Sequence, residues 1–154
     1  MTDNRRFTLR VYGLLIHNEN ILVAEERFKG KRMNKFPGGG LEWGEGLCEV
    51  LIREFKEETN LDVEIVGHFY TTDFFIASAF DQNVQLLSFY YLVKANQIFK
   101  PEMRELDGNK EEDEIFKWLP IREIDAEVYF TFPIDQKVGM MLKELWLTKG
   151  LPAF

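Results

Sequence analysis

Apolar and polar positions alternate from Phe7 to Tyr12, and a continuous apolar run follows at 13–16. Alternation is typical of a strand that is buried on one face, and an apolar run indicates burial on both faces. Residues 17–20 read His-Asn-Glu-Asn, which is turn chemistry, and residues 21–24 are apolar again. The pattern therefore predicts a β-hairpin near the start of the chain.

Strand-like and helix-like patterns follow one another in the later part of the chain. We predict strands over 63–75, 84–93 and 115–119, a turn at 77–83, a polar loop at 94–110, and an amphipathic helix over 134–147 that begins after Pro133. Strands and helices in this order indicate an α/β protein with a mixed sheet between helical layers. With 154 residues, we expect one domain over residues 1–154.

A glycine loop and a helix lie between these two parts. Residues 37–45 contain three consecutive glycines, which allow the backbone to approach a ligand closely. The residues up to Thr59 tolerate a helix. On that helix Glu54, Glu57 and Glu58 stand at i, i+3 and i+4, so their carboxylates share one face. The helix also has an apolar side, formed by Val50, Leu51 and Phe55.

Three carboxylates on one helical face repel one another, and a divalent cation would turn that repulsion into attraction. Ligands that are all oxygen suit Mg²⁺, with Mn²⁺ as a substitute, better than Zn²⁺. Magnesium is usually shared with the phosphates of a substrate. This face therefore predicts metal-assisted attack of water on a phosphate chain.

The segment from Gly39 to Leu61 resembles the signature of the Nudix hydrolases, G-x5-E-x7-R-E-U-x-E-E-x-G-U, in which U is apolar. The matching positions are Gly39, Glu45, Arg53, Glu54, Phe55, Glu57, Glu58 and Leu61. Asn60 stands where the family has glycine. Because asparagine tolerates the left-handed region best after glycine, we expect Asn60 to end the helix in that conformation.

The resemblance implies a Nudix-type α/β/α sandwich and a Mg²⁺-dependent hydrolase of diphosphate bonds. It implies that Glu54, Glu57 and Glu58 bind the metal, and that Glu54 or an acid from a later loop helps to deprotonate water. Glu45 and Arg53 would pair and, with Gly39, hold the loop and helix rigid. Glu57 is counted with Glu54 among the catalytic residues.

Five basic residues fall within the nine positions 27–35, a local reversal of the protein's negative charge. Such a segment is either a solvated loop or a phosphate clamp, since it leads directly into the glycine loop. Arg27, at the end of a predicted strand, is the best candidate for a phosphate-binding residue.

A second acidic cluster, at 110–114, lies ahead of the strand that carries Trp118. Charge runs of this kind are usually solvated. Proteins that resemble this one often take a further metal ligand or base from such a loop. We select Glu112, with Glu111 and Glu114 as alternatives, because spacing alone does not align loop residues.

Composition narrows the function classes. The chain has 19 basic and 26 acidic residues, a net charge of −7, which argues against a general nucleic-acid surface. No signal peptide or apolar run of transmembrane length is present, and Cys48 is the only cysteine, so a cytoplasmic protein is expected. We expect Cys48 to face the core as a small helix residue. The sequence leaves homodimer formation open.

The substrate is less well defined than the reaction. Aromatic residues make up 14% of the chain and could stack on a base, although core packing accounts for most of them. A nucleoside triphosphate is the default substrate, with a nucleotide sugar or an ADP-ribose type substrate as the alternative. A non-catalytic nucleotide sensor would usually lack signature glutamates, and an isopentenyl-type isomerase would need a cysteine outside the signature.

Overall fold

The computed structural model describes residues 2–150 of the chain. Its elements are β1 (Arg6–His17), β2 (Asn20–Phe28), β3 (Lys31–Lys35), β4 (Gly38–Gly40), α1 (Leu47–Thr59), β5 (Val63–Thr71), β6 (Val84–Ala95), β7 (Asp113–Pro120), the 3-10 turn η1 (Ile121–Glu123), α2 (Ala126–Tyr129) and α3 (Pro133–Lys149). The predicted hairpin, the central helix and the long C-terminal helix are confirmed. The central helix ends at Thr59 as expected, and the hairpin strands and the C-terminal helix extend further than the pattern indicated.

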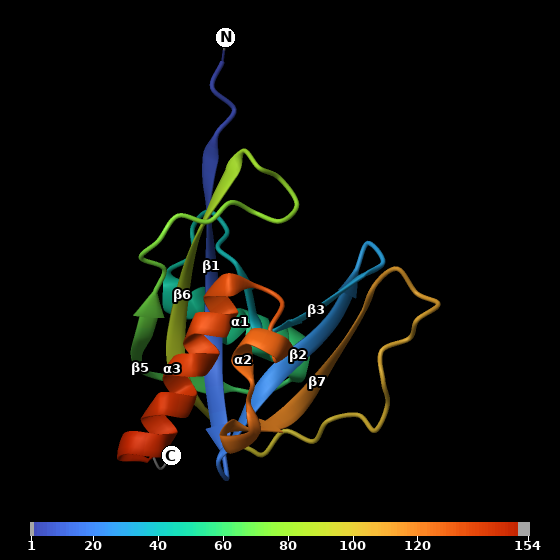
Figure 1. Cartoon of the computed structure of the whole chain (residues 1–154), viewed down its shortest axis with the longest axis vertical. Helices are drawn as coiled ribbons and strands as arrows, with labels where there is room; N and C mark the ends of the chain where they lie inside the picture. Colours follow the sequence, from blue (N-terminus) through green and yellow to red (C-terminus); the bar gives the residue numbers. More distant parts are fainter. Residues whose placement is uncertain (1, 151–154) are drawn as a thin grey trace.

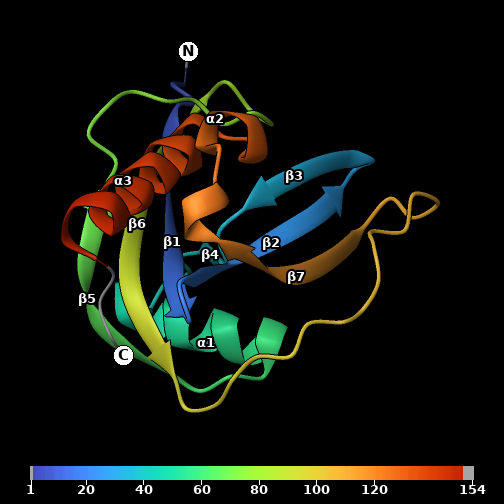
Figure 2. The ribbon, with the colours of Figure 1, turned by 60° about the horizontal axis from the view of Figure 1, so that its bottom comes forward.

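The strands form two groups that share only one corner. One group has the order β4-β1-β6-β5, and the other has β2 between β3 and β7. β1 and β2 pair only next to their connecting turn, at Ile16↔Ile21 and His17↔Asn20, so the two groups diverge away from that turn (Figure 2). β1 and β6 are parallel and the other pairs are antiparallel, which confirms the mixed sheet.

The helices cover opposite faces of β1 because its side chains alternate (Figure 1). Val11 and Leu15 belong to the core cluster that contains Leu51 and Phe55 of α1. The side chains that point to the other face belong to the other cluster, which contains Val138 and Leu142 of α3; they are Tyr12, Leu14 and Ile16. The α/β/α sandwich is thereby confirmed. No helix within residues 2–150 is long and apolar enough to cross a membrane.

The basic segment 27–35 is a hairpin rather than a solvated loop. β2 continues to Phe28, and β3 returns after a turn in which Lys29 and Gly30 have φ values of 50° and 75°. Charged residues are accommodated because they pair across strands: buried Glu25 lies 3.1 Å from Arg32 Nη2 and 3.1 Å from Lys117 Nζ. The many charged residues made this segment look like a loop, whereas ion pairs with neighbouring strands stabilise it as strand β3.

Two other differences are smaller. β5 ends at Thr71, short of the predicted end at residue 75. The prediction that Cys48 faces the core is wrong, because Cys48 is exposed and Leu47 is the first-turn residue that packs against the core.

Asn60 ends α1 with φ 59° and ψ 17°, and its N–H donates to the carbonyl of Lys56. We expect Asn60→Gly to be neutral or slightly stabilising, because glycine adopts this conformation freely. Asn60→Val should lower the free energy of unfolding by about 1 kcal/mol or more, because a β-branched side chain is strained at positive φ. Chemical denaturation of both variants measures this difference. Equal stabilities would show that the left-handed cap contributes nothing.

Candidate active site

A polar cleft of about 480 Å³ is lined by residues of α1, the glycine strand β4, β1, β2 and β3, and the start of β7. Its acidic lining residues are Glu26, Glu54, Glu58, Glu112, Asp113 and Glu114. Its basic lining residues are Arg10, Arg27 and Lys35. Two of the three predicted helix glutamates, and the predicted Glu112 and Arg27, therefore meet in one cleft.

Glu54 is packed against the glycine strand. A Cβ at Gly39 would lie 2.4 Å from Glu54 Oε1, so any other residue there would move the carboxylate end of this side chain from its present position. The same oxygen accepts a hydrogen bond of 3.1 Å from Arg53 Nη1. Gly39 thus has a steric role that the signature alone does not explain.

Glu58 lies deeper in the same cleft and faces other carboxylates. Burial raises its pKa to about 9, and the nearby carboxylates of Glu114 and Glu54 add to the effect. The pKa of Glu114 is raised to about 7, chiefly by burial, although Lys35 opposes the shift. The cleft therefore concentrates negative charge that the protein only partly compensates.

Glu57 behaves differently from the other two helix glutamates. Its carboxylate is 58% exposed, accepts a hydrogen bond of 3.3 Å from Arg53 Nη1, and does not line the cleft. Arg53 also donates two bonds to Glu45, from Nε to Oε2 at 2.6 Å and from Nη2 to Oε1 at 2.9 Å. The Glu45–Arg53 pair thus connects the glycine loop to the helix, as the resemblance implied.

The three predicted metal ligands do not converge on one point in this arrangement. In the part of the chain that the structure describes, no group of three or more His, Cys, Asp or Glu side chains is positioned to hold a metal ion. Arg53 Nη1 lies 3.1 Å from Glu54 Oε1 and 3.3 Å from Glu57 Oε2, so both carboxylates pair with the same guanidinium, and Glu57 does not line the cleft with Glu54 and Glu58.

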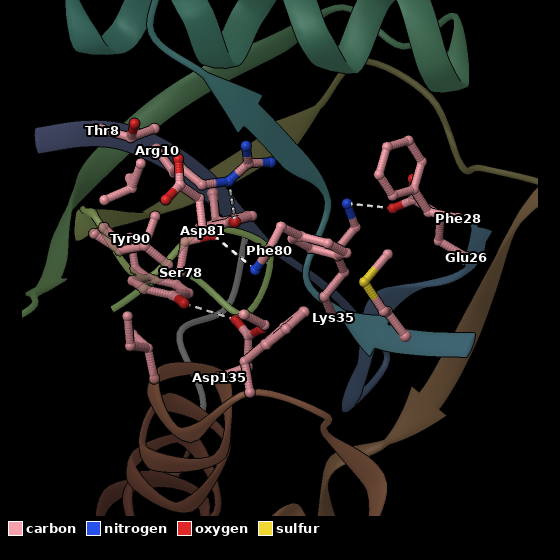
Figure 3. A pocket seen from close by; sticks show the side chains of 18 of the residues that line it. Thr8, Arg10, Glu26, Phe28, Lys35, Ser78, Phe80, Asp81, Tyr90 and Asp135 are labelled. Atoms are coloured by element: carbon pink, nitrogen blue, oxygen red, sulfur yellow. Dashed lines mark hydrogen bonds and ion pairs between the residues drawn. The ribbon is translucent and has the colours of Figure 1, made fainter. Parts of the chain in front are cut away.

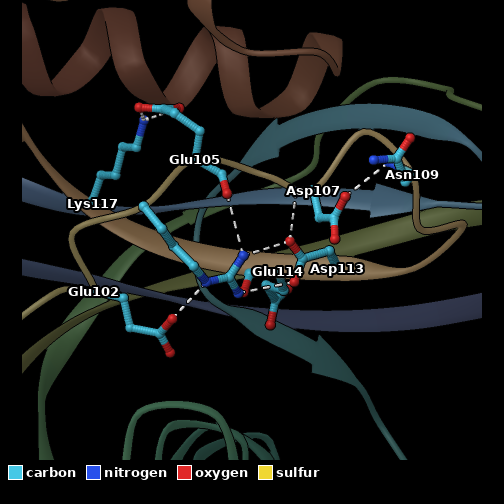
Figure 4. A network of polar contacts seen from close by, with 8 residues as sticks. Glu102, Glu105, Asp107, Asn109, Asp113, Glu114 and Lys117 are labelled. Carbon is cyan, nitrogen blue, oxygen red and sulfur yellow. Dashed lines mark hydrogen bonds and ion pairs between the residues drawn. The ribbon is translucent and has the colours of Figure 1, made fainter.

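The acidic end of β7 is held in place by a network around Asp113 (Figure 4). Arg104 donates to both of its carboxylate oxygens, at 2.6 and 2.9 Å, and the backbone N–H of Asp107 donates at 2.9 Å. Arg104 thereby holds the pKa of Asp113 well below its usual range. The network secures the long loop beside β7, which fixes Glu112 and Glu114 at the cleft.

Sequence reasoning missed part of this lining. Glu26 lies directly opposite Glu114 in the β2–β7 ladder, and Lys35 pairs with Glu26. Arg10 reaches the cleft from β1. Alternation along 24–28 could have placed Glu26 on one face of β2 had that strand been predicted to its full length.

Arg27 is oriented by its own turn. Its Nη1 donates to the carbonyl of Gly30 at 2.9 Å, while its buried Nε has no hydrogen-bond partner among the described residues. An unused, buried donor in a cleft is available to an anionic ligand.

A second cavity, of about 460 Å³, adjoins the cleft (Figure 3). The two spaces share Arg10, Glu26, Phe28 and Lys35 in their linings. One wall is aromatic, since Phe28 and Phe80 meet edge to face with ring centroids 5.6 Å apart. On the opposite side, Tyr90 donates a hydrogen bond of 2.6 Å to buried Asp135 at the start of α3.

Burial raises the pKa of Asp135 to about 7, although the Tyr90 hydrogen bond, Lys35 and Arg10 oppose the shift. A carboxyl group of this kind can be protonated near neutral pH and then donate as well as accept a hydrogen bond. The cavity thus combines flat apolar walls with a polar group, a suitable arrangement for a planar heterocycle.

Comparison with known proteins agrees with the fold and with the signature. The NUDIX domain family model matches residues 7–138. Nudix hydrolase 2 of Arabidopsis thaliana is 32% identical over 119 residues, which are 70% of this chain and 36% of that protein. An RNA pyrophosphohydrolase of a Nitratiruptor species is 33% identical over 111 residues, 68% of this chain and 70% of that protein. The chain thus spans only about a third of its Arabidopsis relative.

Solved structures show the same fold at low sequence identity. The solution structure of the E. coli ORF135 protein has a TM-score of 0.71 at 14% identity and covers 99% of both chains. A NUDIX hydrolase from Nitrosomonas europaea has a TM-score of 0.67 at 21% identity, with 97% of this chain and 98% of that chain covered. Taken with the match of the family model to most of the sequence, these likenesses show that the chain belongs to the Nudix hydrolase family.

Proposed function

We propose that this protein is a metal-dependent hydrolase of the diphosphate bond in a nucleoside diphosphate linked to another group, with nucleoside triphosphates as the favoured substrates. The observation that carries the proposal is the pair of adjoining spaces: a cleft lined by carboxylates and cations, and an aromatic cavity with a buried polar pair. A nucleotide is a molecule of the same two parts, with charged phosphates and a flat base.

The donor chemistry of the cleft fits a hard divalent cation. Carboxylate oxygens from α1 and β7 gather there, and burial, together with the nearby carboxylates of Glu114 and Glu54, raises the pKa of Glu58. We propose Glu54 and Glu58 as ligands of Mg²⁺ or Mn²⁺, joined by Glu57 once its carboxylate leaves Arg53. A bound ion of this type polarises phosphoryl oxygens and lowers the pKa of a water ligand.

Side chains of the protein would accept the proton of the attacking water, bind the phosphates and position the helix. Glu54 or Glu112 would accept the proton of the attacking water, with Glu114 of β7 as the alternative acid. Arg27, with its free Nε, would bind phosphate oxygens and offset charge that develops on them. The Arg53–Glu45 pair would hold the glycine loop against the helix, so that Gly39 keeps Glu54 in position.

The second cavity would hold the base. Phe28 and Phe80 would supply stacking surface, and protonated Asp135 could donate a hydrogen bond to a ring nitrogen or carbonyl. The relative that is named an RNA pyrophosphohydrolase supports a second candidate substrate, the 5′-triphosphate end of an RNA. The net charge of −7 argues against long nucleic acid contacts, so we favour free nucleotides.

A substrate panel tests the proposal. Ribo- and deoxyribonucleoside triphosphates, nucleotide sugars, ADP-ribose and a short 5′-triphosphorylated RNA are incubated with the protein and Mg²⁺ or Mn²⁺, and the products are separated by chromatography. We expect a nucleoside monophosphate and pyrophosphate from at least one triphosphate, and no turnover with EDTA. Absence of hydrolysis across the panel with both metals, by a correctly folded protein, would reject the proposal.

A further inference from the structure

Two cations occupy the junction between the cleft and the second cavity, and the family signature includes neither. Arg10 projects from β1 and Lys35 from the end of β3, so they come from the two strand groups that diverge at this point. Both residues line both spaces, and Figure 3 shows them beside the cavity. A ligand that extends from one space into the other would therefore come close to both cations.

The guanidinium of Arg10 has unused hydrogen-bonding capacity. Its Nε donates to the hydroxyl of Tyr12 at 2.6 Å, which is the one hydrogen bond that Arg10 makes through its side chain to another described residue. No carboxylate within residues 2–150 forms an ion pair with it. Tyr12 thus fixes the plane of the guanidinium while both Nη groups stay available to a ligand.

Lys35 differs from Arg10 because it already has a charged partner. Its side chain is 12% exposed, and its Nζ forms an ion pair with Glu26 Oε2. The ammonium group has three donors, so the ion pair leaves capacity for a second acceptor. Glu26 therefore holds Lys35 at the junction and leaves N–H donors of Lys35 free for a ligand.

We propose that Arg10, assisted by Lys35, binds the phosphate that is attached to the nucleoside, where the substrate crosses from the aromatic cavity into the acidic cleft. A planar guanidinium with two free Nη groups matches the geometry of two phosphate oxygens. The cations also offset the like charge that an anion would meet in a cleft lined by carboxylates. This inference rests on the proposed function and assigns it a phosphate site outside the family signature.

The test measures binding of nucleosides and of nucleoside monophosphates separately, by isothermal titration calorimetry with Mg²⁺ present. The probes are adenosine, guanosine, cytidine and uridine, and their 5′-monophosphates. In the wild type, at least one monophosphate should bind at least tenfold more tightly than its nucleoside. In Arg10→Met that advantage should fall by tenfold or more, while the affinity for the nucleoside stays within about twofold. KM for the substrate should rise more than kcat falls.

Arg10→Lys is the second variant, because it retains the charge and should recover part of the lost affinity. Arg122→Met is the matched control: Arg122 is exposed on η1, its nearest acidic partner is the adjacent Glu123 at 3.8 Å, and it lines neither space. Circular dichroism and thermal unfolding verify that each variant is folded.

Three outcomes would overturn the inference: equal losses for nucleoside and monophosphate, unchanged binding in both Arg10 variants, or a wild type that binds none of the probes. If Arg10→Met does not fold, the result is taken from Arg10→Lys, which should weaken monophosphate binding by at least threefold. The binding test is independent of the proposed function because it does not measure hydrolysis. A protein that hydrolyses no nucleotide would disprove the proposed function, whereas the inference about Arg10 is decided by the calorimetry alone.

Discussion

Replacement of Glu58 by glutamine is expected to lower kcat by two or more orders of magnitude, equivalent to about 3 kcal/mol or more of transition-state stabilisation. The substitution preserves the shape of the side chain and replaces a carboxyl group, which can ionise when a metal ion binds, with an amide that cannot. Burial raises the pKa of Glu58, and the nearby carboxylates of Glu114 and Glu54 raise it further. A ligand of a divalent ion is needed in its charged form, which glutamine cannot provide.

Glu49→Gln is the control for Glu58→Gln, since Glu49 is an exposed glutamate in the first turn of the same helix. Binding of Mn²⁺, measured by electron paramagnetic resonance without substrate, supplies a readout that does not depend on turnover. We expect weaker Mn²⁺ binding in Glu58→Gln and normal binding in Glu49→Gln. Near-normal kcat and Mn²⁺ binding in folded Glu58→Gln would remove Glu58 from the site.

Measurements of kcat and Mn²⁺ binding on Glu57→Gln test whether Glu57, which does not line the cleft, binds the metal. If Glu57 exchanges Arg53 for the metal, its loss of activity should equal that of Glu58→Gln. If it remains paired with Arg53, activity should be close to normal, and the metal site would consist of the acids from α1 and β7 that already line the cleft.

The extent to which the sequence predicted the site depends on how local each contact is. The shared face of Glu54 and Glu58 follows from helical geometry, and the left-handed Asn60 follows from the tolerance of asparagine for that conformation at a helix end. The Glu45–Arg53 pair was implied by the resemblance to the family and not by geometry. The direction of Glu57 was not predictable in the same way, because side-chain rotation allows it to face either the other glutamates or Arg53.

The sequence did not predict the contacts between residues of strands that are distant along the chain. Glu26 and Glu114 are 88 positions apart and become neighbours only through the register of β2 against β7. Arg10 and Lys35 meet the same cleft because β1 and β2 separate after the hairpin turn. The register of β2 against β7 and the separation of β1 from β2 produce no periodic pattern within a single segment of the sequence. From the sequence, the charged residues of the cleft therefore looked like ordinary surface residues.

Asp135 is expected to make the stability of the folded protein depend on pH. Asp135 is 2% exposed, and burial raises its pKa from 3.8 to about 7. The folded state therefore holds a proton that the unfolded state has already released. The stability that this proton contributes is fully present below about pH 4 and is lost as the pH rises through about 7. A shift of this size corresponds to up to about 4 kcal/mol.

Asp135→Asn should remove that pH dependence. The asparagine carbonyl oxygen can still accept the hydrogen bond from the Tyr90 hydroxyl, and the side chain does not ionise. We expect the variant and the wild type to have similar melting temperatures at pH 4.5, and the variant to melt roughly 10 °C higher at pH 8.5. Thermal unfolding at half-unit steps of pH gives the melting temperature of the variant minus that of the wild type as a difference curve. Contributions of Glu58 and Glu114 are common to both proteins and cancel in this difference.

Asp125→Asn is the control, because Asp125 is exposed and its side chain makes no capping hydrogen bond to α2. Its difference curve should be flat. A flat curve for Asp135→Asn as well would show that Asp135 ionises at an ordinary pH despite its burial. It would then be a charged acceptor at neutral pH, and the second cavity would select ligands that donate to it. A rising curve instead leaves a protonated carboxyl group in the cavity up to about pH 7, able to donate to a ring nitrogen or carbonyl of the base.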